Sequence, residues 1–113
     1  MKISKELAKG STALLVMSVL SKSDMYGYQI IKTVEMMSEN VFQMNEGTLY
    51  PILHSLEKEG YLTSYLCEVD GRQRKYYKIT DKGLKQFAEK KSEWNVFSTA
   101  VAKVLGGAEL ANA

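Results

Sequence analysis

The stretch from Asn45 to Leu62, NEGTLYPILHSLEKEGYL, most constrains how this 113-residue chain can fold. Its apolar residues recur every three or four positions, as they do along one face of a helix. These residues are Leu49, Ile52, Leu53, Leu56 and Tyr61. Gly60 predicts the end of the helix, because glycine readily adopts the left-handed conformation in which helices terminate. We therefore predict an amphipathic helix that stops at Gly60, after which Tyr61 and Leu62 open a strand.

The opposite face of this predicted helix carries small, hydroxyl-bearing and basic side chains and few acids. It consists of Gly47, Pro51, His54 and Lys58, flanked by Thr48, Tyr50 and Ser55. Such groups can reach phosphates and base edges in a nucleic-acid groove. An ordinary surface helix is the more common explanation of this pattern when it stands alone. For His54 in particular, plain solvent exposure and a nucleic-acid contact are both open.

The start of the same helix depends on how Pro51 is accommodated. If Thr48 is the N-cap, Pro51 lies in the first turn, where no intrahelical hydrogen bond is lost. If Asn45 is the N-cap, one such bond is lost in the second turn. The sequence leaves both caps open.

A β-hairpin pattern follows the helix. Residues 61–69 (YLTSYLCEV) and 74–79 (RKYYKI) are rich in aromatic and β-branched residues, which favour strands. Asp70-Gly71 between them is a strong turn signal. Four positive charges lie on the turn and the return strand, at Arg72, Arg74, Lys75 and Lys78. A helix followed by a basic two-stranded ribbon is the layout of a winged helix-turn-helix.

The runs GTLYPILHSLEKEGYL and GRQRKYYKITDKG closely resemble the PadR family of bacterial transcription regulators. The upstream MYGYQIIK is similar to that family's Tyr-Gly-Tyr helix opening, and one long C-terminal helix is typical of the short PadR-like subgroup. The resemblance covers roughly Lys9 to Leu105. It implies a winged helix-turn-helix that binds operator DNA as a dimer. Some multidrug sensors of this kind hold planar aromatic compounds between paired tryptophans, and other relatives sense phenolic acids.

Three further elements are predicted before the hairpin. Residues Lys5–Leu20 indicate a first helix capped by Ser4, although Gly10 is unfavourable inside it. Met25–Ser38 indicates a second helix, and Val41–Met44 a short strand. The second helix is expected to bury one stripe of side chains, formed by Tyr26, Ile30, Val34 and Met37.

The last predicted helix runs from Asp81 to Leu105 and is capped by Thr80. These 25 residues would span roughly 37 Å, and their apolar stripe is too long for a small winged domain to cover. We therefore expect the same helix of a second subunit to pack on it. The expected interface consists of Leu84, Phe87, Trp94, Phe97, Val101 and Leu105. From the residues alone, packing in the dimer is the favoured role of Trp94. The resemblance favours a second role, in which Trp94 forms part of an effector site.

The predicted fold class is mainly α with a small β-hairpin, a winged helix-turn-helix plus a long C-terminal dimerisation helix. Residues 1–80 form the DNA-binding region, 81–105 the dimerisation helix and 106–113 a flexible tail. The composition is ordinary for a globular domain, with 45% hydrophobic and 25% charged residues. A net charge of +2 says little about nucleic acid. One cysteine, and no apolar run long enough to span a bilayer, lead us to expect a cytoplasmic protein.

Catalytic and metal-binding functions have little support in the sequence. His54 and Cys67 are the only imidazole and thiol, so one chain cannot assemble a zinc site of the usual composition. Ser55 and Lys58 match the Ser-x-x-Lys motif of penicillin-binding enzymes, but the companion motifs of those enzymes are missing. No Gly-rich phosphate loop follows a strand. We expect no enzyme activity, no cofactor and no metal.

These observations predict a homodimeric transcriptional repressor that binds double-stranded DNA at an inverted-repeat operator. The resemblance implies that a small, planar aromatic effector releases it. The recognition helix is expected to contact DNA through Thr48, Tyr50, Pro51, His54, Ser55 and Lys58. The wing is expected to contact it through Arg72, Arg74 and Lys75. The alternative is a winged-helix module for protein–protein interaction, in which the basic wing serves only solubility.

Overall fold

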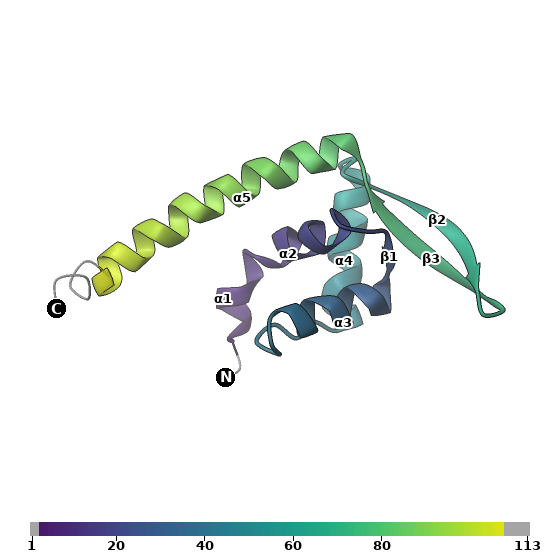
Figure 1. Cartoon of the computed structure of the whole chain (residues 1–113), viewed down its shortest axis with the longest axis horizontal. Helices are drawn as coiled ribbons and strands as arrows, with labels where there is room; N and C mark the ends of the chain where they lie inside the picture. The colour runs from purple at the N-terminus through teal and green to yellow at the C-terminus, as the bar shows by residue number, and fades with distance from the viewer. Residues whose placement is uncertain (1–2, 108–113) are drawn as a thin grey trace.

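The computed structural model describes residues 3–107, which fold into helices and a three-stranded antiparallel sheet joined by loops (Figure 1). The elements are α1 (Lys5–Lys9), α2 (Thr12–Leu20), β1 (Met25–Tyr26), α3 (Gly27–Met37), α4 (Glu46–Lys58), β2 (Leu62–Val69), β3 (Arg72–Ile79), α5 (Asp81–Ala102) and the π-helical turn η1 (Lys103–Gly107). The strand order in the sheet is β1-β3-β2. The predicted fold class, mainly helical with a basic hairpin and a long last helix, is confirmed.

The predicted first helix is interrupted. The Ser4 side chain caps α1 by accepting a hydrogen bond from the backbone N–H of Leu7, as expected. The helix then stops at Gly10, and α2 begins only at Thr12. The prediction of one continuous helix is therefore wrong, because glycine disfavours a helix interior and Ser11 favours a cap position.

The second predicted helix starts two residues late. Residues Met25 and Tyr26 form the short strand β1, paired with Tyr77 and Tyr76 of β3, and α3 begins only at Gly27. A strand of two residues has no periodicity that a sequence could reveal. This pairing adds a third strand to the expected hairpin.

The buried stripe of α3 and the strand expected after it also differ from the structure. Ile30 and Val34 are buried as predicted, whereas Met37 is 52% exposed because it ends the helix beyond the core. The strand predicted at Val41–Met44 is wrong. These residues form no strand, and Phe42 and Met44 instead pack against the core as a loop.

The recognition helix α4 is capped by Asn45, whose side-chain oxygen accepts a hydrogen bond from the Thr48 backbone N–H at 2.9 Å. This rules out Thr48 as the N-cap. Pro51 consequently lies inside α4, where it removes one backbone hydrogen bond. The helix is held in place because Leu49 and Leu53 are fully buried. They join a core built mainly of α2, α3, α4 and the base of the hairpin.

The hairpin has the shortest common turn. Leu62 pairs with Ile79 at its base and Val69 with Arg72 at its tip. Only Asp70 and Gly71 lie between the strands, both with positive φ, as in the two-residue turns that match strand twist. The return strand therefore begins at Arg72, two residues before the predicted start.

Helix α5 leaves the body of the protein and extends far beyond it (Figure 1), which makes the molecule 59 Å long. The Thr80 side chain caps it by accepting a hydrogen bond from the Gly83 backbone N–H, as expected. The α-helix ends at Ala102, three residues before the predicted end, and continues as η1, which includes Gly106 and Gly107. Of the predicted flexible tail, residues 108–113 lie outside the described residues. Across residues 3–107, no helix has the length and apolar character needed to cross a membrane.

Candidate nucleic-acid interface

One face of α4 stands free of the core. Its predicted contact residues are all exposed: Thr48, Tyr50, Pro51, His54, Ser55 and Lys58. Because Leu49 and Leu53 anchor the other face, these six side chains are presented together on one rigid element. A free helix face carrying hydroxyls, an imidazole and an amine has the groups needed to contact phosphates and base edges.

Tyr50 has a second contact that the sequence did not reveal. It is 37% exposed, because part of its ring packs on the start of α3. A Cβ added to Gly27 would lie 2.6 Å from the Tyr50 hydroxyl oxygen. The close approach of α3 and α4 therefore depends on glycine at position 27. The sequence feature that indicates this contact is the Tyr-Gly-Tyr run, which places Gly27 between two large residues.

Glu57, the next-to-last residue of α4, is turned away from the exposed face. Glu57 accepts a hydrogen bond from the Ser64 hydroxyl at 2.6 Å and so links α4 to β2. Among the described side chains, the ion pairs are Lys32–Glu35 and Lys90–Glu93. Neither pair uses a basic residue of α4 or of the hairpin. The positive charges at this surface are thus not neutralised by ion pairs among the described residues.

The hairpin divides its basic residues between two faces. Successive side chains of a strand point to opposite sides, and Tyr77 of β3 is buried against the core. Lys75 shares the Tyr77 side, with its amine 5.5 Å from the Tyr77 ring centre. Arg72 and Arg74 lie on the opposite, outer side. The three predicted wing contacts are therefore close in sequence but do not form one cluster.

Three tyrosines cross the outer side of the sheet, one from each strand. Tyr26 of β1 and Tyr65 of β2 are both paired with Tyr76 of β3. The Tyr65 and Tyr76 rings are stacked with centres 5.7 Å apart. The Tyr26 and Tyr76 rings meet edge to face at 5.5 Å. We call these residues the tyrosine ladder. The Arg74 guanidinium lies over the Tyr26 ring, 4.4 Å from its centre.

The ladder is also tied to the loop before β1. The Tyr65 hydroxyl donates a hydrogen bond to the Asp24 carboxylate at 2.7 Å. This hydrogen bond holds the phenol proton and raises the pKa of Tyr65 to about 12. Burial raises the pKa of Tyr77 on the other side of the sheet. Sequence reasoning missed the ladder because its members come from three segments, and 41 residues separate Tyr65 from Asp24.

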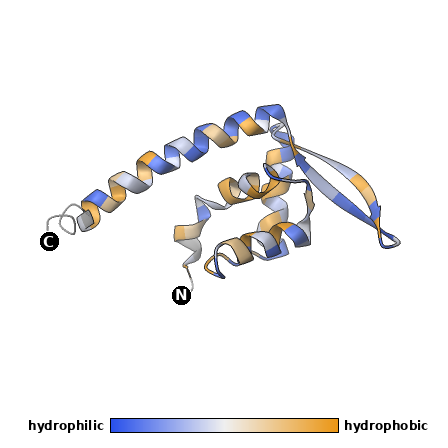
Figure 2. Cartoon of the chain, in the orientation of Figure 1, coloured by the Kyte–Doolittle hydropathy of each residue, from blue (hydrophilic) through white to orange (hydrophobic). Residues whose placement is uncertain are grey.

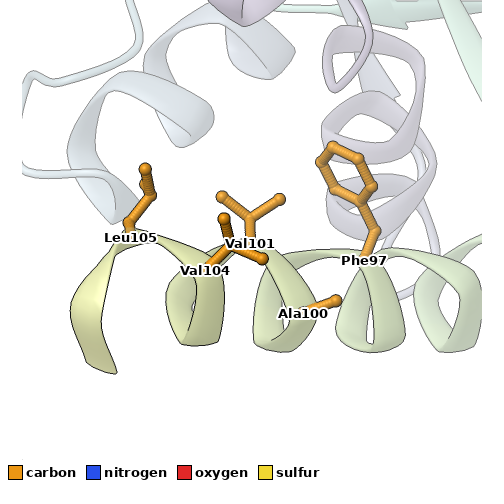
Figure 3. Close-up of a pocket in the computed structure, with 5 residues that line it drawn as sticks. All are labelled: Phe97, Ala100, Val101, Val104 and Leu105. Carbon is orange, nitrogen blue, oxygen red and sulfur yellow. The ribbon is translucent and has the colours of Figure 1, made fainter. Parts of the chain in front are cut away.

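The second predicted site lies on α5, away from α4 and the hairpin (Figure 1). Trp94 is 45% exposed and Phe97 64% exposed, and apolar residues recur along the far half of the helix (Figure 2). A shallow hollow of about 300 Å³ is lined by Phe97, Ala100, Val101, Val104 and Leu105, whose side chains are shown in Figure 3. Trp94 does not line this hollow. Among residues 3–107, no three His, Cys, Asp or Glu side chains are grouped so that they could hold a metal ion.

Comparison with known proteins gives one consistent result. The family model described as the transcriptional regulator PadR-like family matches residues 16–89. The chain is 32% identical over 93 residues to Uncharacterized protein X of Lysinibacillus sphaericus, covering 81% of this chain and 85% of that protein. A transcriptional regulator from Clostridium thermocellum has a similar solved structure, with a TM-score of 0.81, 33% identity and coverage of 87% of this chain and 96% of that one. A PadR-like transcriptional regulator from Bacillus cereus gives a TM-score of 0.78 at 33% identity, covering 88% and 96%.

Proposed function

The chain belongs to the PadR-like family of transcriptional regulators, and from that premise we propose that it is a homodimeric repressor acting on an inverted-repeat operator. Members of this family are transcriptional regulators that bind DNA, not enzymes. The observation that carries the proposal is the exposed face of α4 beside a basic hairpin whose charges have no ion-pair partner among the described residues.

The exposed face of α4 would enter the major groove of the operator. Its hydroxyl groups, the His54 imidazole and the Lys58 amine can hydrogen-bond to base edges, which differ between base pairs in that groove. The burial of Leu49 and Leu53 supports this role, because it fixes the rotation of the helix about its axis. Tyr50 would present only the part of its ring that α3 does not cover.

The hairpin would contact the DNA backbone beside the recognition helix. Arg72, Arg74 and Lys75 can bind phosphates, which have the same chemistry at every sequence. They would therefore supply affinity more than specificity. The division of these residues between two faces of the hairpin favours a wing that enters a groove and touches both of its walls.

Dimerisation would be carried by α5. Its apolar residues from Trp94 to Leu105 are exposed along a helix that leaves the body, and packing against a second copy would remove them from water. A two-fold axis between the copies would place the two α4 helices on an inverted repeat, with half-sites about 34–36 Å apart.

Release from the operator would follow binding of a small, planar aromatic effector near Trp94 in the dimer. A half-exposed indole on the proposed subunit interface supports this site, since planar aromatic compounds stack on such rings. Because the proposed partner is double-stranded DNA, the regulator would act in the cytoplasm.

The direct test is fluorescence anisotropy with labelled duplexes from the DNA around the coding region, searched first for inverted repeats. The proposal predicts saturable binding that weakens steeply as salt concentration rises. An unrelated duplex of equal length is the control and should bind more weakly. Absence of binding to every duplex at low salt would contradict the proposal and favour a protein-interaction module.

A further inference from the structure

We propose that Tyr26 is a positioning residue that holds the Arg74 guanidinium ready to bind a DNA phosphate. This inference rests on the proposed function. It assigns a residue outside the wing to the support of the wing's phosphate contact. Arg74 belongs to β3 and Tyr26 to β1, so the contact joins the wing to the segment that immediately precedes α3. The relevant distance is 4.4 Å from the guanidinium carbon to the ring centre.

The chemistry of the guanidinium allows both contacts at once. It is planar, and its N–H donors point outward from the edge of that plane. A cation over an aromatic ring is attracted to the ring face. Stacking therefore uses the face of Arg74 and leaves edge donors available to a phosphate. No ion pair among the described side chains involves Arg74, which is half-buried.

The ring below Arg74 is itself fixed. Tyr26 is paired with Tyr76 in the sheet, and its backbone N–H donates a hydrogen bond to the side-chain oxygen of Gln29. The Tyr76 ring packs edge to face against Tyr26 and is stacked on its other neighbour, Tyr65, which is hydrogen-bonded to Asp24. A long arginine side chain that would otherwise sample many rotamers is thus placed on a rigid platform before DNA arrives. Such preorganisation reduces the entropy lost on binding.

The test is a double-mutant cycle measured with duplex DNA. The variants are Tyr26→Leu, Arg74→Met and the pair together, with Tyr26→Phe as the variant that keeps the ring. We expect Tyr26→Leu to weaken binding about five- to thirty-fold, because two subunits each lose a cation–ring contact. Tyr26→Phe should bind like the wild type. Once Arg74 is replaced by methionine, Tyr26→Leu should cause no additional weakening.

Tyr61→Leu is the matched control, because it removes a ring that also lies beside a cation, the amine of Lys82 at 5.2 Å. Lys82 lies on α5 and not on the wing, so the loss of this ring should leave DNA affinity unchanged. If Tyr26→Leu weakens binding equally with and without Arg74, Tyr26 acts only on the fold and the inference is overturned. If the wild type binds no duplex at all, the proposed function and this inference fail together.

A second variant covers the case in which Tyr26→Leu does not fold. Arg74→Lys keeps the charge on the same strand but lacks the planar group that stacks on a ring. We expect it to bind DNA at least about fivefold more weakly than the wild type, while the thermal unfolding midpoint stays the same. Equal affinity of Arg74→Lys and the wild type would overturn the inference, because charge alone would then account for the contact.

Discussion

Gly83, in the first turn of α5, lies directly against the carbonyl oxygen of Tyr61, and a Cβ at position 83 would collide with it. The same carbonyl accepts a hydrogen bond from the backbone N–H of Thr80. The Thr80 hydroxyl donates to the Gly60 carbonyl, and the Lys82 amine to the Glu59 carbonyl, each at 2.7 Å. The end of the recognition helix is thus fastened to the start of the helix that we propose for dimerisation.

This joint gives the first prediction. Gly83→Ala should destabilise the protein by about 2 kcal/mol or more, because backbone atoms must shift to admit the methyl group. Gly10→Ala is the control, since a Cβ at position 10 has nothing within 4 Å. It should leave stability unchanged or raise it by less than about 1 kcal/mol. Chemical denaturation followed by circular dichroism measures both, and equal stability of the two variants would contradict the packing described.

The second prediction concerns alkaline pH. The pKa of Tyr65 is raised from 10.0 to about 12 by its hydrogen bond to Asp24. The folded state therefore keeps this proton at pH values where the unfolded chain loses it. The resulting stability is fully present below about pH 10 and is lost as the pH rises towards about 12. Tyr65→Phe should remove this pH-dependent part of the stability. The thermal unfolding midpoint of the variant should therefore fall less steeply than that of the wild type as the pH rises over that range. Parallel curves for variant and wild type would show that the hydrogen bond does not hold the proton.

The third prediction concerns assembly. Truncation after Lys91 removes the exposed apolar segment of α5, and we expect it to give a monomer or an insoluble protein. The full-length chain should sediment as a dimer at micromolar concentration, because the residues from Trp94 to Leu105 pack on a second copy. Analytical ultracentrifugation distinguishes the two states. A full-length chain that remains a monomer over the concentration range would refute the proposed interface.

The fourth prediction concerns the effector. The chain has one tryptophan, so any change in indole emission reports on Trp94. Planar aromatic compounds should quench this emission in a saturable manner. Trp94→Ala should weaken their binding by about 1 kcal/mol or more, the scale of an aromatic stacking pair. If a panel of planar dyes leaves the emission unchanged, Trp94 is a packing residue and the effector site lies elsewhere.

Local signals allowed much of the fold to be predicted. Ser4 and Thr80 cap the helices that they are predicted to cap, and Asp70-Gly71 forms the expected turn. Asn45, which caps α4, is one of the two caps that the sequence allows. Each of these depends on groups a few residues apart. The stripe from Leu49 to Leu56 is likewise a helical repeat that remains visible without a structure.

Features that depend on distant segments were missed. The strand β1 is too short to show a period and exists only because β3 lies beside it. Val41–Met44 has the composition of a strand but forms a loop, in which Phe42 and Met44 pack on the core. Among the candidate site residues, the exposed set on α4 followed from the helical repeat. The position of Arg74 over Tyr26 could not be predicted, because it requires the pairing of β1 with β3.

The division of labour between recognition helix and wing is the central claim, and a competition titration at several salt concentrations tests it most directly. Operator and random duplexes compete for the wild type, His54→Ala and Arg72→Met. His54→Ala should lower the preference for the operator by about 1–3 kcal/mol, the range for removing one base-specific hydrogen-bonding group. Arg72→Met should weaken binding to both duplexes alike. It should also reduce the slope of the logarithm of the binding constant against the logarithm of salt concentration, by about one for each phosphate that a subunit no longer neutralises. An unchanged operator-to-random ratio in both variants would contradict the assignment.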